Sequence, residues 1–165
     1  MKQENCLEVI PEALGQITGK GAFLTVADGD RLNTMTIGWA TIGYVWKRNI
    51  MTAAVRLSRH TFSLIENSDN FSVSVPTVDM AKELAFCGSK SGSDYDKFKE
   101  CNLEIVDPQK ITTPIIKMPG LHFECTIVYK SAMDPSFMTP DFEAIYPKKD
   151  YHTLYYGEIV DCYRI

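Results

Sequence analysis

Short runs of alternating apolar and polar residues recur along this chain, and turn residues separate them. The clearest run, Phe71–Val75, alternates strictly and stops at Pro76. Strict alternation is typical of a β-strand with one buried face, whereas a helix repeats its apolar residues every three or four positions. Alternation also predicts strands at Asn33–Tyr44 and Phe123–Tyr129. Ala22–Ala27 is a short apolar run that ends at a turn, and further strands are predicted at Ile50–Val55 and Leu154–Tyr163.

Helical patterns are few and short. One helix is predicted over Thr61–Asn67, with Thr61 as its N-cap, and another over Asp79–Phe86. A third is expected to begin at Ser93, with Asp96 as the acidic partner of a serine cap. About six or seven strands with a few short helices favour a β-barrel over a doubly wound sheet, since long crossover helices are missing.

Turn and loop residues add detail to this outline. Asp28-Gly29 predicts a tight hairpin after the first strand. Gly157 lies inside the last predicted strand, where glycine indicates a bulge or a close approach of another chain segment. Asp134–Asp150 contains three prolines and predicts a long loop of the kind that often covers a functional site.

Charge and composition narrow the class of protein. The 165 residues include seventeen Lys and Arg against twenty-one Asp and Glu, and the clustered basic excess of a nucleic-acid binder is missing. No apolar run reaches the ~20 residues of a membrane helix, and Met1–Ile10 lacks the apolar core of a secretory signal. Five scattered cysteines without a CxxC pair predict free thiols and no metal site. We therefore expect one cytoplasmic domain over residues 1–165, without nucleic-acid or membrane partners.

Several catalytic motifs fail at their defining positions. Residues 15–21 resemble a P-loop, but they are one residue short between the glycines, and Gly21 stands where Ser or Thr would bind magnesium. Residues 88–92 resemble a nucleophile elbow, but Lys90 replaces the serine. GxGxxG and HExxH are absent. A P-loop NTPase, a serine hydrolase, a Rossmann dehydrogenase and a zincin are therefore disfavoured.

Three polar clusters remain, each next to a predicted strand. Residues 33–36 (Asn-Thr-Met-Thr) leave space for a flat ligand beside the sheet, or they form an ordinary half-exposed strand. Residues 56–61 (Arg-Leu-Ser-Arg-His-Thr) offer a guanidinium, hydroxyls and helix-start amides to a phosphate, or they form a solvated turn. Residues 87–97 bring glycines and Lys97 to a ligand, or they form a flexible surface loop.

In order and separation, these clusters resemble the flavin reductase-like family, whose FMN-binding domain is a split β-barrel. The resemblance covers about residues 20–163 and implies a mainly β fold with short helices. The segments that carry it are residues 33–36 with Trp39, residues 56–61, Cys87-Gly88 with Ser91-Gly92 and Asp96-Lys97-Phe98, Pro114-Ile115-Ile116, residues 121–125, and His152 before Tyr156-Gly157-Glu158.

The resemblance also implies a homodimer that holds one FMN per subunit near its interface. The side chains that would line the flavin ring and its chain are Asn33, Thr34, Thr36 and Trp39. Those that would hold the phosphate are Arg56, Ser58 and Thr61, while Ser91 and Lys97 would close the site and His152 would lie near the ring. Strand periodicity places Trp39 on the same face as Met35 and Ile37, which is also where a core residue would lie.

The implied activity is that of a flavin-dependent oxidoreductase, either an NAD(P)H:flavin reductase or a flavoredoxin-type electron carrier. FMN would carry the redox chemistry, with NADH, NADPH or a redox protein such as a ferredoxin as the electron donor. A pyridoxamine-phosphate-oxidase-like enzyme and a non-catalytic β-barrel binding module are the alternatives. The chain departs from the family at Val45–Arg48, where prolines are common, and in the Asp134–Asp150 insertion, which aligns with no family segment.

Overall fold

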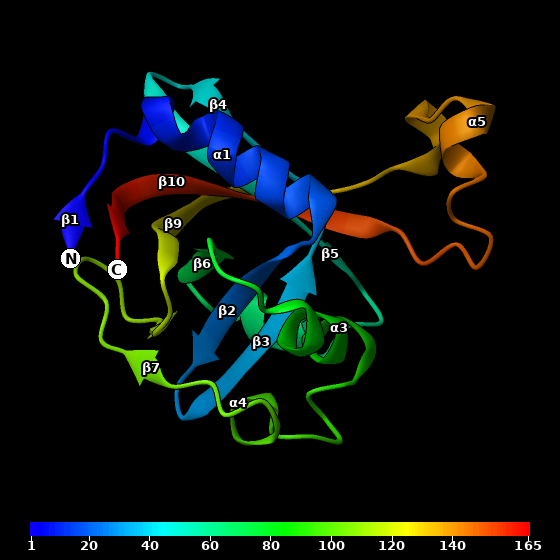
Figure 1. Ribbon diagram of the computed structural model, residues 1–165. Helices are drawn as coiled ribbons and strands as arrows, with labels where there is room; N and C mark the ends of the chain where they lie inside the picture. The colour runs from blue at the N-terminus through cyan, green and yellow to red at the C-terminus, as the bar shows by residue number, and fades with distance from the viewer.

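One antiparallel sheet dominates the computed structural model, which describes residues 1–165 (Figure 1). Its strands follow the order β3-β2-β6-β9-β10-β5-β4, with β1 paired to β10. The strands are β1 (Lys2–Gln3), β2 (Ala22–Asp28), β3 (Arg31–Ile37), β4 (Ala40–Val45), β5 (Arg48–Arg56), β6 (Asn70–Pro76), β9 (Gly120–Ala132) and β10 (His152–Arg164). The fold is mainly β, as predicted. Because β3 and β4 end the order and do not pair, the sheet stays open between them, which is compatible with a split barrel.

A helix that the strand patterns do not predict covers part of this sheet. In α1 (Cys6–Gly19), the buried residues Cys6, Val9, Ala13 and Ile17 recur every three or four positions, so one face of the helix joins the main core. The Asn5 side chain accepts a hydrogen bond from Leu7 N and caps the first turn. The main core therefore lies between α1 and the inner face of the sheet (Figure 1).

The short helices differ in detail from the predictions. α2 (His60–Ile65) and α3 (Ala81–Ser89) lie close to their predicted positions. α4 (Lys97–Glu100) begins four residues later than predicted, because Asp96 is itself the N-cap and its carboxylate accepts from the backbone N–H groups of residues 98 and 99. A smaller core lies under α3 and α4, beside the two-stranded sheet β7 (Ile105–Val106) and β8 (Ile115–Ile116).

The predicted strand Asn33–Tyr44 is two strands. β3 ends at Ile37, and after Gly38 and Trp39 the chain enters β4, at the opposite end of the strand order. The interpretation of Trp39 as a core residue is therefore wrong, because Trp39 lies at the corner between two strands and not within one. Trp39 is 45% exposed, whereas Met35 is buried.

Both glycine predictions are confirmed. β2 and β3 form a hairpin in which Asp28 pairs with Arg31, so the loop is Gly29-Asp30, and Gly29 has a positive φ of 58°. At Gly157 the register between β10 and β9 shifts. A Cβ at this position would lie 2.6 Å from Phe71 Cζ of β6 and 2.7 Å from Cys125 Cβ of the neighbouring β9, so these side chains pack too closely for a larger residue.

The predicted loop Asp134–Asp150, here called the arm, projects from the body between β9 and β10 (Figure 1). It contains two short helical segments, η1 (Pro135–Phe137) and α5 (Pro140–Glu143). Phe137 is 88% exposed. None of the helices has the length and apolar content needed to cross a membrane.

Candidate functional site

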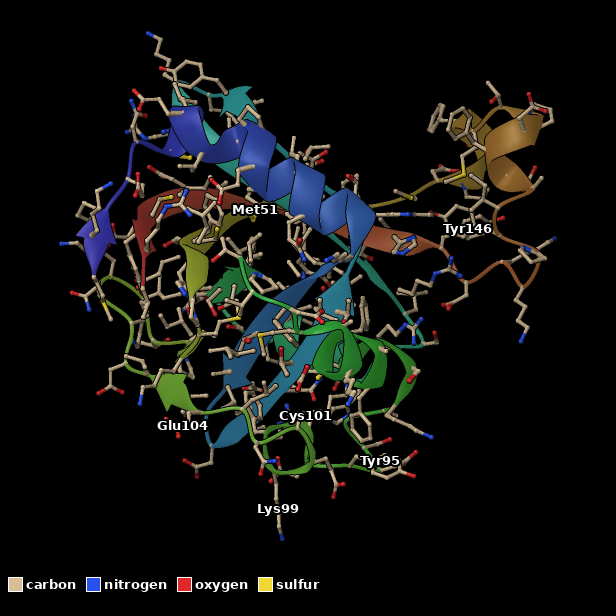
Figure 2. The ribbon with its side chains drawn as sticks, viewed as in Figure 1. Met51, Tyr95, Lys99, Cys101, Glu104 and Tyr146 are labelled. Atoms are coloured by element: carbon tan, nitrogen blue, oxygen red, sulfur yellow. The ribbon has the colours of Figure 1, made fainter.

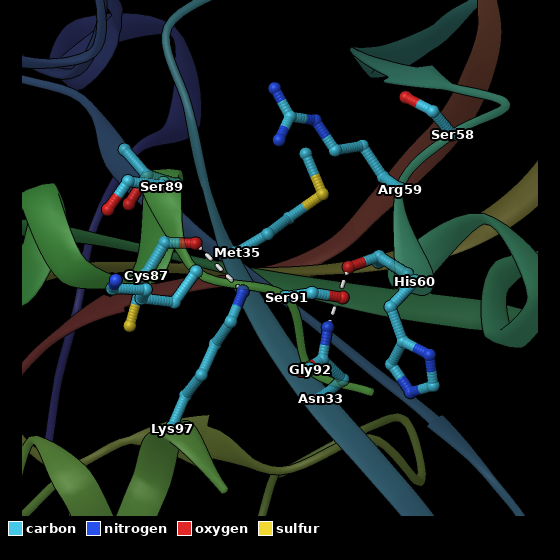
Figure 3. Close-up of a pocket in the computed structure, with 14 residues that line it drawn as sticks. Asn33, Met35, Ser58, Arg59, His60, Cys87, Ser89, Ser91, Gly92 and Lys97 are labelled. Atoms are coloured by element: carbon cyan, nitrogen blue, oxygen red, sulfur yellow. Dashed lines mark hydrogen bonds between the residues drawn. The ribbon is translucent and has the colours of Figure 1, made fainter. Parts of the chain in front are cut away.

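The three polar clusters meet at the unpaired edge of β3 (Figure 3). There the loop after β5 and the end of α3 enclose a cavity of about 80 Å³. The residues that line it are Asn33, Met35, Thr36, Ser58, Arg59, His60, Thr61, Cys87, Gly88, Ser89, Lys90, Ser91, Gly92 and Lys97. Segments up to about sixty residues apart in the sequence thus line one cavity, which we call the first cavity.

A buried hydrogen bond joins the first two clusters. Asn33 Nδ2 donates to Thr61 Oγ1 at 2.8 Å, and both side chains are buried. The prediction that Thr61 caps α2 is therefore wrong. The N-cap position belongs to Arg59, and no side chain caps this helix. Thr61 instead turns inward, and its hydroxyl hydrogen remains free to donate, since it accepts from Asn33.

The two threonines of β3 have different environments. Thr34 is fully buried, and its hydroxyl donates to Leu24 O at 3.2 Å, so its side chain lines no part of the cavity. Thr36 Oγ1 donates to Leu84 O at 2.6 Å and ties α3 to the edge of β3. An added Cβ at Gly88 would lie 3.3 Å from Thr36 Cβ, so α3 packs closely against β3 at this point.

The third cluster supplies a buried cation. Lys97 is only 4% exposed, and its Nζ donates to Cys87 O at 2.8 Å (Figure 3). Burial lowers the pKa of Lys97. Ser91 Oγ lies 2.8 Å from Ser93 Oγ. Gly92 packs so closely on Asn33 that a Cβ there would overlap Asn33 Oδ1, and it would lie 2.8 Å from His60 Cδ2. The loop therefore approaches β3 only because residue 92 is glycine.

A second cavity of about 170 Å³ adjoins the first and shares Met35, Thr36 and Arg59 with it. Trp39, Arg56 and His152, which the sequence also predicts as site residues, line it. The only predicted side chain that lines neither cavity is Thr34.

His152 is held between aromatic side chains in the second cavity. Its ring centroid lies 4.7 Å from that of Trp39, and its Nδ1 lies 2.7 Å from the hydroxyl oxygen of Tyr146. Burial, together with the positive charge of Arg56, lowers the pKa of His152 to about 4. The imidazole is therefore neutral at pH 7.

Cations without a carboxylate partner line the two cavities. Arg59 and Lys90 line the first cavity with Lys97, and Arg56 lines the second. Neither Arg56 nor Arg59 forms a salt bridge within the chain, and no Asp or Glu lines either cavity. Guanidinium and hydroxyl donors of this kind suit a phosphate.

Two contacts from the arm were not predicted. Tyr146 packs against His152 at the base of the arm (Figure 2). Asp150 accepts hydrogen bonds from Ser58 N at 3.2 Å and Ser58 Oγ at 2.5 Å. Neither residue belongs to a periodic pattern, so only the path of the folded chain reveals these contacts. Arg59 was also missed as a site residue, although it lies inside the second polar cluster.

Comparison with known proteins gives a family and a fold. The model of the flavin reductase like domain matches residues 14–165. An uncharacterized protein of Archaeoglobus fulgidus is 29% identical over 138 residues, which are 84% of this chain and 68% of that protein. The chain thus spans about two thirds of the length of the curated relatives it matches.

Two solved structures illustrate the shared fold. Flavoredoxin from Methanosarcina acetivorans is 24% identical, with a TM-score of 0.68 over 88% of this chain and 68% of that one. The NADH:FAD oxidoreductase of Streptomyces globisporus, solved with NAD and FAD fragments, is 18% identical, with a TM-score of 0.66 over 88% of this chain and 75% of that one.

Proposed function

Because the chain belongs to the flavin reductase-like family, we propose that it is an FMN-binding oxidoreductase that takes electrons from NADH or NADPH. The observation that carries the proposal is the pair of adjoining cavities, lined by unpaired cations and free of carboxylates. The alignment of flavoredoxin and of an NADH:FAD oxidoreductase with this fold supports the same class of chemistry.

The donors at the site fit a phosphomonoester. Arg56, Ser58 and Thr61 would hold the phosphate, and Arg59 adds a second guanidinium that the chain leaves unpaired. Lys97 uses one of its three N–H groups on Cys87 O, so two remain for a ligand. FMN offers the negative charge that this set of donors requires.

The ring would extend toward the second cavity. Trp39 and His152 provide aromatic faces there, and Asn33 and Thr36 line the β3 side of the first cavity. When bound, FMN would supply the two-electron chemistry that protein side chains lack. The chain's own part is to orient the ligand and to stabilise negative charge on it through Arg56, Arg59 and Lys97. Because His152 is neutral at pH 7, it can orient a ligand without adding charge.

We also propose that two copies of the chain form the working protein. The cavities, of about 80 and 170 Å³, are smaller than the roughly 300–1,000 Å³ of typical small-molecule pockets, so one chain leaves much of an FMN uncovered. Tyr44, Trp46 and Tyr129 are each at least half exposed on the β4, β5 and β9 side, as an interface would require. Five free thiols agree with a reducing compartment such as the cytoplasm.

Flavin titration tests the proposal. The purified protein should retain about one FMN per chain after excess flavin is removed, as read from the flavin absorbance. Arg56→Ala should weaken FMN binding roughly 10–100-fold, since a charge-assisted hydrogen bond contributes about 1.5–3 kcal/mol. Arg31→Ala removes an equal charge from the β2–β3 hairpin and is the matched control. A wild-type chain that binds no FMN would contradict the assignment.

The electron donor is tested separately. NADH or NADPH added without oxygen should bleach the bound flavin within seconds to minutes, and the faster of the two identifies the donor. A flavin that stays oxidised with both nucleotides, but is reduced by a ferredoxin, would replace the nucleotide donor with a protein one. The mass of the protein in solution, measured by light scattering with and without FMN, tests the homodimer.

A further inference from the structure

The arm meets the site at two places: Tyr146 packs beside His152, and the carboxylate of Asp150 reaches Ser58. Asp150 accepts hydrogen bonds from both the backbone N–H and the hydroxyl of Ser58, at 3.2 and 2.5 Å. Ser58 lines the first cavity, whereas Phe137 and Phe142 of the arm are exposed. The chain thus brings an anion of its own to two donors at the margin of the cavity.

This carboxylate lies in a cationic environment. Arg56, Arg59 and Asp150 all lie near enough to His152 to act on its charge. The Arg56 guanidinium lies 5.2 Å from the centre of the Tyr146 ring, at the second contact of the arm. Asp150 nevertheless forms no salt bridge with either arginine, so the guanidinium groups remain available for a second anion.

We propose that the Asp150 carboxylate takes the place of a phosphate oxygen on the donors of Ser58, and that a phosphate that binds there displaces it and releases this end of the arm. The inference rests on the proposed function, since FMN supplies the phosphate. The donors of Ser58 cannot serve both anions at once. A phosphomonoester carries about −1.5 to −2 charge at pH 7 and more acceptor oxygens than a carboxylate, so it is the stronger partner for the two arginines.

The arm thereby makes the site sensitive to the phosphate of a flavin. Any free energy that holds Asp150 on Ser58 opposes phosphate binding, and the coupling is reciprocal. A flavin without phosphate does not compete for Ser58, so Asp150 has no effect on its affinity. FMN and riboflavin, which differ only in the phosphate, are therefore the matched pair of probes.

We call the contact between Asp150 and Ser58 the latch. Flavin fluorescence titrations of the wild type and of two variants test it. Asp150→Asn keeps the size of the side chain and removes its charge, so it should bind FMN about tenfold more tightly than the wild type, with riboflavin affinity unchanged. Asp141→Asn removes an equal charge from the exposed tip of the arm and should alter neither affinity. Unchanged or weaker FMN binding by Asp150→Asn, or an equal gain for both flavins, would overturn the latch.

A second experiment uses the wild-type chain alone. Lys148 and Lys149 are exposed next to Asp150, so trypsin reports on the release of the arm. FMN should accelerate cleavage at these two lysines, and riboflavin should not. Slower cleavage with FMN would mean that the arm closes on the ligand, which contradicts the latch. If neither flavin binds to the wild type or to Asp150→Asn, the proposed function itself fails, and the latch fails with it.

Discussion

Charged side chains have partners within the chain in the sheet interior but lack ionic partners at the candidate site. Glu124 on β9 is fully buried, yet its carboxylate accepts from the backbone N–H groups of residues 109–111 at 2.7–3.3 Å and from the Tyr163 hydroxyl at 2.6 Å. Arg56 and Arg59 are more accessible and have no ionic partner in the chain. A buried charge with all its partners supplied by the chain supports the fold, whereas one left without them is available to a ligand.

The two buried histidines also differ between the sheet interior and the candidate site. His122 lies in the sheet interior, where Ser74 Oγ and Met118 O each lie 3.1 Å from one of its ring nitrogens. His152 has one ring nitrogen near Tyr146 and lines the second cavity. Both have a pKa of about 4, chiefly because burial disfavours the charged ring. Similar pKa values therefore do not imply similar roles.

Removing the Glu124 charge should give the largest loss of stability. In Glu124→Gln, an amide group replaces a carboxylate oxygen and faces backbone N–H donors, so we expect about 3–5 kcal/mol less free energy of unfolding. Urea denaturation measures this loss. Glu104→Gln, which removes an exposed partner of Lys117, should leave the urea midpoint nearly unchanged. A loss below about 1 kcal/mol for Glu124→Gln would show that the interior carboxylate is not a structural centre.

Acid should lower the free energy of unfolding through both buried histidines. The unfolded chain binds their protons below a pKa of about 6.5, whereas the folded chain binds them only near pH 4. Stability is therefore full above about pH 6.5 and falls as the pH drops toward 4, by on the order of 3 kcal/mol for each histidine. His152→Gln cannot take up this proton and should remove roughly half of the fall. Urea midpoints at several pH values test this, and an undiminished fall in the variant would mean that His152 does not contribute.

In contrast to Glu124, the arginines without ionic partners should matter for FMN binding and not for stability. Arg59→Ala should weaken FMN binding about tenfold. Its free energy of unfolding should stay the same or rise slightly, because the change removes repulsion between Arg59 and the nearby cations. Flavin titration and urea denaturation of the same preparation measure the two quantities. A clear loss of stability would place Arg59 with Glu124, as a structural charge.

Local patterns predict much of this arrangement. Alternation and short apolar runs bounded by turn residues find β2, β5, β6, β9 and β10, and Gly157 marks the bulge in advance. Nine of the ten candidate side chains line the cavities; the polar clusters contain seven of these nine, and the family resemblance adds Trp39 and His152. Thr34 is the exception, because both faces of β3 are covered and alternation does not show which face borders the site.

What the sequence does not predict depends on contacts between distant segments. The corner at Gly38-Trp39 moves the chain from one end of the sheet to the other, and nothing in the alternation changes there. α1 contains Pro11, which weakens its helical pattern, and it is stabilised by packing on the sheet. Asp150 lies 92 residues from Ser58 in a loop without periodicity, so their contact is visible only in the folded chain.

The smallest predicted effect lies where the structural and functional regions meet. Thr36 donates to Leu84 O and also lines both cavities, so it belongs to the fold and to the site. Thr36→Val keeps the shape and removes this bond, which should cost about 1 kcal/mol of unfolding free energy and weaken FMN binding a few-fold as α3 loosens. Thr18→Val removes a similar bond, to Leu14 O on α1, and should leave FMN affinity unchanged. If both variants alter FMN affinity equally, the bond from Thr36 to Leu84 O does not hold α3 in place. The edge of β3 would then not set the position of the third cluster.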